Sequence, residues 1–222
     1  MSKLLINGCS YTVNWSPLCA QLGNQLGFTE TTNLSMPGSS NDRIFRTTLE
    51  YIFTNDVKYV IIALTFWDRQ EAPWGKSATW TDYSHNGLLR ASEVDSPNLY
   101  NSYIQDRYRY DININYIDKL LNDIITFSGW LESKDIKYLI FTSSGNYFEK
   151  NNFKFIQTKL DYLKQNPRII DIETWTSNQY MYDHGGTSIE LNGPPDGRHY
   201  TKESFATLNE FIVDYINTNK LL

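Results

Sequence analysis

The feature that most constrains the fold is the continuous apolar run YVIIALTF at Tyr59–Phe66. Its β-branched residues do not alternate with polar ones, which is typical of a strand buried on both faces in the middle of a parallel sheet. Parallel strands need long crossover connections, and these are usually helices. The run therefore predicts an α/β protein with helices on both faces of its sheet.

Strand and helix patterns alternate along the rest of the chain. Further strands are predicted at 3–7, 31–36, 137–144 and 168–172, and helices at 16–26, 41–53, 115–132, 151–163 and 202–217. Ser16 is predicted to cap the first helix, with Pro17 following it, and Asn41 or Asp42 to cap the second. This order predicts a three-layer α/β/α sandwich around a parallel sheet of about five strands, of flavodoxin-like type.

A long stretch at about 67–111 interrupts this alternation. It is rich in Trp and Tyr and shows no clean period, in a chain that is 15% aromatic. Loops this long within a domain usually serve function or carry small elements of their own. We therefore expect one domain over 1–222 with an aromatic-rich insertion, which forms either a lid whose rings stack on sugars or a small satellite core.

Charge and composition exclude several classes of protein. The net charge is −5 and the sequence contains no Lys/Arg block, which argues against nucleic-acid binding. No apolar run approaches the roughly 20 residues that span a bilayer, and the start MSKLLINGCS lacks a signal-peptide segment, so we expect a cytoplasmic protein with no membrane partner. Two cysteines, with no CxxC pair or His/Cys cluster, predict neither a disulfide framework nor a metal site.

Polar residues follow the predicted strands, where ligands of open α/β sheets bind. They are Ser10, then Gly38 and Asn41, then Trp67, Asp68 and Arg69, then Ser143 and Ser144, with Asp196 and His199 before the last helix. If the strands are parallel, all of these residues meet at one edge of the sheet.

Ser10 can act as a nucleophile only with a base beside it and a group that orients the base. Of the three histidines, His199 has the best context, because PPDGRHYT places Asp196 three residues before it in a Pro/Gly turn. The turn would bring the carboxylate to Nδ1 and leave Nε2 for Ser10. Taken alone, the motif also fits a solvated loop histidine.

The motifs occur in a characteristic order: GCSYT after the first strand, NLSMPGSSN after the second, YVIIALTFWD as the third, and DGRHYT before the last helix. This order resembles the SGNH/GDSL hydrolase superfamily from Leu4 to about Phe211, outside the insertion. The resemblance implies Ser10 as nucleophile, His199 as general base and Asp196 as its orienter. It also implies an oxyanion hole from the backbone amides of Ser10 and Gly38, and no metal or organic cofactor.

Two positions depart from the family pattern. Cys9 stands where the family usually has Asp, and it is itself a second candidate nucleophile. The family's Gly-x-Asn-Asp block reads TFWD here, so Trp67 occupies the position of the side-chain oxyanion donor. An indole N–H is also a donor, and Asn41, Thr65 or Arg69 are the alternatives to it.

Two residues at the start of the insertion are candidate substrate contacts. Trp67 would stack on a ring, and Arg69 would bind an anionic or polar group. Alternatively, Arg69 pairs with Asp68 or Glu71 and holds the insertion in place.

The motifs together predict a serine esterase acting on a small-molecule or glycan ester, and the aromatic content favours an O-acyl carbohydrate. The alternative is a catalytically weakened binding protein or a virion or assembly protein. The Asn/Tyr-rich composition and a viral origin would fit that alternative.

Overall fold

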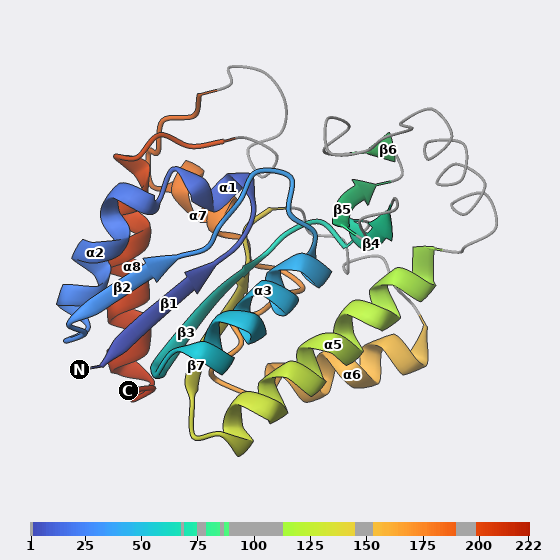
Figure 1. Ribbon diagram of the computed structural model, residues 1–222. Helices are drawn as coiled ribbons and strands as arrows, with labels where there is room; N and C mark the ends of the chain where they lie inside the picture. Colours follow the sequence, from blue (N-terminus) through green and yellow to red (C-terminus); the bar gives the residue numbers. More distant parts are fainter. Residues whose placement is uncertain are drawn as a thin grey trace.

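The computed structural model describes residues 2–67, 69–74, 79–84, 87–88, 113–144, 153–189 and 199–222. A parallel sheet with strand order β2-β1-β3-β7 runs through the centre of this part of the chain (Figure 1). Its strands are β1 (Lys3–Asn7), β2 (Glu30–Asn33), β3 (Val57–Leu64) and β7 (Lys137–Thr142). A parallel bridge between Ile140 and Ile169 adds a fifth position beside β7. The predicted parallel sheet of flavodoxin-like type is confirmed.

Strand β3 explains why its sequence is apolar without alternation. Val60 and Ile62 face one hydrophobic core, whereas Ile61 and Ala63 face a second core on the opposite side of the sheet. All four side chains are fully buried. A strand covered on both faces has no side on which polar residues would be solvated.

Helices cover both faces and complete the predicted three layers (Figure 1). One face carries α2 (Ser16–Gln25), α7 (Ser177–Asp183) and α8 (Ser204–Thr218), and the other carries α3 (Asn41–Thr54), α5 (Asn113–Ser133) and α6 (Lys154–Lys164). None of the described helices has the length and apolarity needed to cross a membrane.

The two predicted helix caps are wrong. A one-turn helix, α1 (Ser10–Val13), precedes α2, so that the chain is already helical at Trp15 and the Ser16 side chain makes no cap. Instead, Ser16 Oγ accepts a hydrogen bond from Asn33 Nδ2 at 2.9 Å. Helix α3 is capped by Ser40, whose Oγ accepts from the backbone N–H of Arg43 at 3.2 Å.

The predicted insertion at about 67–111, whose sequence shows no clean period, contains regular structure. Strands β4 (Gln70–Trp74), β5 (Thr79–Ser84) and β6 (Gly87–Leu88) form an antiparallel sheet beside the main one (Figure 1). The register pairs Gln70 with Tyr83 and Trp74 with Thr79. A two-residue strand and a proline in β4 weaken the period-2 signal that sequence reading depends on.

Candidate active site

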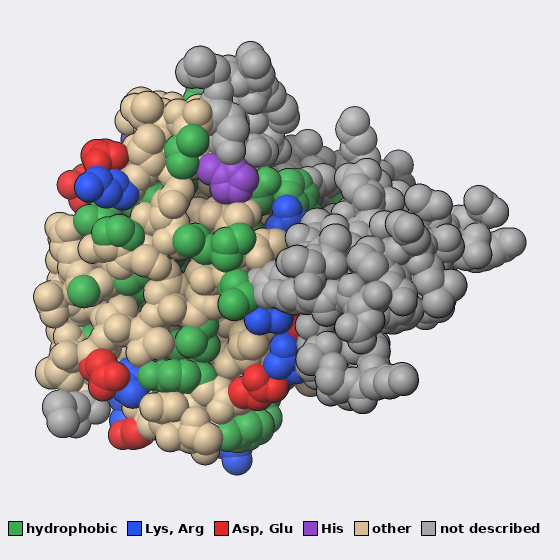
Figure 2. Space-filling view, turned by 45° about the horizontal axis from the view of Figure 1, so that its top comes forward, with side chains coloured by type: hydrophobic (Ala, Val, Ile, Leu, Met, Phe, Trp, Pro, Cys, Tyr) green, Lys and Arg blue, Asp and Glu red, His purple; other side chains and the backbone are tan. Residues whose placement is uncertain are grey.

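The predicted site residues follow the carboxyl ends of the strands, as the parallel sheet requires. Ser10 follows β1, and Trp67 and Arg69 follow β3, while His199 precedes α8. In Figure 2 the molecule is turned so that the top of Figure 1 comes forward, and a histidine side chain is visible beside hydrophobic ones. Asp196 lies outside the described residues, so its placement stays a prediction.

Ser10 and Cys9 have opposite environments. The Cys9 side chain is fully buried, with Sγ 3.9 Å from Ser143 Oγ, whereas Ser10 is half-buried at the start of α1. Of the two candidate nucleophiles, the serine is therefore the one that a substrate could approach.

Gly8 allows α1 to begin immediately after β1. A Cβ added at Gly8 would lie 2.2 Å from Thr12 Oγ1 and 3.1 Å from the carbonyl oxygen of Ala63 in β3. The Thr12 hydroxyl oxygen also lies 2.9 Å from both Cys9 O and Ser35 Oγ. This close packing fixes the turn that carries Ser10 against β3 and against the segment after β2.

The structure brings His199 to α1. The imidazole stacks on the ring of Tyr11, the residue directly after Ser10, with ring centroids 4.6 Å apart and planes at 16°. The Asn14 side chain donates a hydrogen bond to Tyr200 O at 3.1 Å. On its other side, this segment pairs with 187–189, where Ile189 N donates to His199 O at 2.7 Å and Thr201 N to Thr187 O at 2.9 Å.

Gly38 lies in a turn that is hydrogen-bonded to the backbone just before Ser10. Met36 to Ser39 form a β-turn closed by a hydrogen bond from Ser39 N to Met36 O at 3.2 Å, and Gly38 has φ +76°. Pro followed by a residue of positive φ is the pattern of a type II turn, in which glycine is favoured. Met36 N donates to Gly8 O at 3.3 Å, which ties the turn to the backbone just before Ser10.

Asn41 uses its carboxamide to hold the end of β3. Its Oδ1 accepts from Thr65 N at 2.9 Å, and its Nδ2 donates to Thr65 O at 3.1 Å and to Phe66 O at 3.3 Å. The residue is 4% exposed. Both of its amide hydrogens already have backbone acceptors, so these contacts account for Asn41 without an oxyanion.

Trp67 and Arg69 take different directions. The Trp67 ring packs against the α3/α5 side of the core, with its centroid 6.4 Å from that of Tyr116 in α5. The Arg69 guanidinium lies 4.9 Å from the Phe66 ring centroid and 6.0 Å from that of Tyr11. Of these two, Arg69 is the one placed beside the Tyr11–His199 pair.

Glu71, one of the two partners considered for Arg69, binds α3, and Asp68, the other, lies outside the described residues. Arg46 donates to both Glu71 carboxylate oxygens, from Nε at 2.8 Å and Nη2 at 2.6 Å, and Arg43 Nη1 lies 3.6 Å away. The Glu71 side chain is 1% exposed. The bidentate contact raises the pKa of Arg46 above its usual value. Glu71 therefore anchors β4 to α3.

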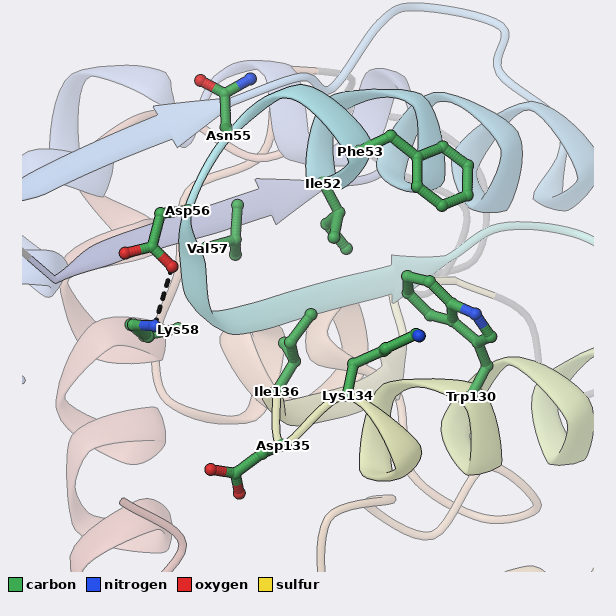
Figure 3. A pocket seen from close by; sticks show the side chains of 10 residues that line it. All are labelled: Ile52, Phe53, Asn55, Asp56, Val57, Lys58, Trp130, Lys134, Asp135 and Ile136. Carbon is green, nitrogen blue, oxygen red and sulfur yellow. Dashed lines mark ion pairs between the residues drawn. The ribbon is translucent and has the colours of Figure 1, made fainter.

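Two pockets lie away from this edge. One of about 560 Å³ lies at the amino end of β3 beside the ends of α3 and α5, and its polar groups include the Asp56–Lys58 ion pair (Figure 3). A groove of about 710 Å³ runs between α3 and α5, lined by rings such as Phe45 and Phe127. Neither lining contains the serine and histidine that acyl transfer needs.

Among the described residues, no group of three or more His, Cys, Asp or Glu side chains could hold a metal ion.

Sequence reasoning missed Tyr11, in α1, and Asn14, directly after it, which both contact the His199 segment. The sequence carries one signal that points to Tyr11, which is that it directly follows Ser10 in GCSYT. Adjacency alone does not show which distant residue a side chain will meet.

Comparison with known proteins identifies the fold. No protein-family model and no curated protein matches the chain. Among solved structures, it is similar to a psychrotrophic esterase from Pseudoalteromonas sp. inhibited by monoethylphosphonate, with 12% identity over 97% of both chains and a TM-score of 0.52. It is also similar to a putative acylhydrolase from Bacteroides fragilis, with 13% identity over 98% of this chain and 87% of that chain and a TM-score of 0.51. A GDSL-like lipase from Bacteroides thetaiotaomicron has 14% identity over 98% and 88%, with a TM-score of 0.51. The chain therefore has the SGNH hydrolase fold that its motifs predict.

Proposed function

We propose that the protein is a serine esterase in which Ser10 is the nucleophile, His199 the general base and Asp196 the residue that orients the base. The observation that carries the proposal is the stacking of the His199 ring on Tyr11, next in the chain to Ser10. A base must lie within hydrogen-bond reach of its nucleophile, and the stack on Tyr11 supports this role because Tyr11 is the residue next to Ser10.

The proposed reaction has two steps. His199 takes the proton of the Ser10 hydroxyl as Oγ attacks the ester carbonyl, and it then gives that proton to the departing alcohol. Water next attacks the acyl-enzyme, again with His199 as base, and releases the acid and free Ser10.

The oxyanion would be held by the backbone amides of Ser10 and Gly38. The hydrogen bond between Met36 N and Gly8 O supports this, because it attaches the Gly38 turn to the strand end that carries Ser10. One such donor contributes about 3 kcal/mol to the transition state. Asn41, the third candidate donor, would have to give up a hydrogen bond to Thr65 O or Phe66 O.

We further propose that the substrate is a small-molecule or glycan ester, with an O-acyl carbohydrate favoured by the aromatic-rich sequence at about 67–111. Arg69, beside Tyr11, is the proposed contact for a polar or anionic part of the substrate. Trp67, which is half-buried, is the proposed stacking partner for a ring of the substrate.

The test is reaction with p-nitrophenyl acetate and labelling by a fluorophosphonate probe. We expect wild-type protein to be labelled, Ser10→Ala to be unlabelled, and His199→Ala to be labelled at least about 100-fold more slowly. Cys9→Ala is the matched control, because it removes the neighbouring buried thiol and should leave labelling intact.

Absence of labelling in folded wild-type protein would contradict the esterase. It would favour a binding or assembly protein, for which the engaged Asn41 amide and the core contact of Trp67 already provide an argument.

A further inference from the structure

We propose that α1 positions the general base as well as the nucleophile, and that Tyr11 is the positioning residue for His199. The inference rests on the proposed esterase function and deepens it. Ser10, Tyr11 and Asn14 lie within or directly after one helical turn, and two of them contact the segment that carries the base.

The stacked geometry suits a catalytic histidine. Both imidazole nitrogens direct their hydrogen or lone pair outward in the plane of the ring. A contact to the ring face fixes the plane without occupying either nitrogen, whereas a hydrogen bond would occupy one. The near-parallel stack on Tyr11, with planes at 16°, therefore orients the base and leaves its edge to the nucleophile and to an orienting carboxylate.

The second contact fixes the position of the base along α1. The Asn14 carboxamide donates to Tyr200 O, one residue beyond His199. With the ring held at Tyr11 and the backbone held at Asn14, the segment has two attachment points on the same turn. A β-bridge between Ser188 and Tyr200 supports the His199 segment on its other side.

Tyr11 is itself held firmly enough to position another residue. Its side chain is 6% exposed, and its ring meets the Phe66 ring in an edge-to-face contact, with centroids 5.7 Å apart and planes at 63°. The helix that carries it is packed on Gly8, where a Cβ has no room. The ring is thus part of the rigid junction between β1 and β3.

A second tyrosine–histidine stack in the molecule provides a matched control. Tyr180 and His184, one turn apart near the end of α7, have ring centroids 4.0 Å apart at 28°. There the His184 Nδ1 lies 2.8 Å from Tyr180 O, so that a ring nitrogen is used within the same turn. That pair has the same chemistry as Tyr11 and His199, but it joins residues within one turn.

The experiment measures fluorophosphonate labelling rates and p-nitrophenyl acetate kinetics for Tyr11→Leu, Tyr11→Phe and Tyr180→Leu. We expect Tyr11→Leu to lower kcat and the labelling rate by about 10-fold to 100-fold, because a small misplacement of a catalytic group has effects of this size, while KM changes little. Tyr11→Phe keeps the ring and should restore both rates to within about two-fold of wild type, and Tyr180→Leu should leave them unchanged.

A second measurement does not depend on turnover. In NMR spectra of histidine-labelled protein, the His199 ring protons should be shifted by the Tyr11 ring current, and they are identified by their loss in His199→Gln. The shift should persist in Tyr11→Phe and vanish in Tyr11→Leu. Absence of the shift in wild-type protein would overturn the inference.

The two proposals fail in different ways. If wild type is labelled and Tyr11→Leu reacts as fast as Tyr180→Leu, the positioning role is overturned and the esterase stands. If wild type itself is not labelled, the esterase proposal fails and the positioning role fails with it.

Discussion

The Asn41 carboxamide binds the backbone at the end of β3 as acceptor and as donor. Buried N–H and C=O groups that follow a strand have lost their ladder partners and need others. A side-chain amide supplies both kinds of partner at once. This explains why an asparagine, and no apolar residue, occupies a position that is 4% exposed.

Replacing Asn41 should therefore affect stability. We expect Asn41→Ala to lower the free energy of unfolding by about 1–3 kcal/mol, the cost of leaving buried backbone groups unsatisfied. Urea denaturation measures it. Asn122→Ala is the matched control, because Asn122 is exposed and its side chain donates to Asp118 on the same helix. Equal effects of the two substitutions would contradict this role for Asn41.

Cys19 provides a test of pH dependence. Burial raises the pKa of its thiol to about 12, and the thiol donates to Trp15 O at 3.4 Å. In the unfolded chain the thiol ionises around its ordinary pKa of 9.0. Because the folded-state pKa is the higher one, the contribution of Cys19 is complete below pH 9 and declines as the pH rises toward 12.

We expect this decline to reach about 1.4 kcal/mol per pH unit well above pH 9. The measurement is the free energy of unfolding at pH 8 to 10 for wild type and Cys19→Ala. Their difference should shrink with rising pH, since only wild type carries the titrating thiol. A difference that stays constant would show that the thiol is not protected in the folded state.

Among the elements, β4, α3 and α5 are joined by charged side chains. Glu71 of β4 is held by Arg46 of α3, and its backbone N–H donates to Asp42 Oδ2 at 3.1 Å. Asp42 in turn pairs with Lys119 of α5. The start of the insertion is thus attached to the helix layer on one face of the sheet.

Arg46 allows a controlled test of the attachment of β4 to α3, because it has a buried and an exposed carboxylate partner. Arg46 also pairs with Glu50 at 2.8 Å, but the Glu50 side chain is 59% exposed, compared with 1% for Glu71. We expect Glu71→Ala to cost about 3 kcal/mol, because it removes the buried carboxylate to which the partly buried guanidinium donates two hydrogen bonds. Glu50→Ala should cost less than about 0.5 kcal/mol. Chemical denaturation compares them, and equal costs would exclude a buried anchor at Glu71.

At the scale of the whole molecule, one sheet separates two hydrophobic cores. Ile124 of α5 is buried in the core on the α3/α5 face, and Ile212 of α8 in the core on the α2/α8 face. Ser10 and His199 lie at the edge where the strands end and belong to neither core, although Trp67 packs against the core on the α3/α5 face. Substitutions in either core should therefore change stability without changing the chemistry at Ser10.

The two cores should respond independently. We expect Ile124→Val and Ile212→Val to cost about 0.5–1.5 kcal/mol each, and the double variant to equal their sum within about 0.5 kcal/mol. Phe45→Leu with Phe127→Leu is the positive control, because these rings are 4.9 Å apart and should couple. Coupling between Ile124 and Ile212 as large as in the control pair would contradict the separation.

Features that depend on a local pattern can be predicted from the amino-acid sequence. The apolar run at Tyr59–Phe66 predicts a strand buried on both faces, and the order of the motifs predicts the fold. Hydrophobic periodicity carries this information because a strand or helix repeats the same environment at a fixed spacing. The helix caps were misplaced by single residues, since several neighbouring polar side chains satisfy the same cap pattern.

Contacts between side chains that are distant in the chain become visible only in the folded structure. His199 lies on Tyr11, Glu71 binds Arg46, and Asn41 holds the end of β3. Each of these contacts joins segments far apart in the chain. Their partners depend on the distance and direction between packed elements, which no local sequence pattern encodes.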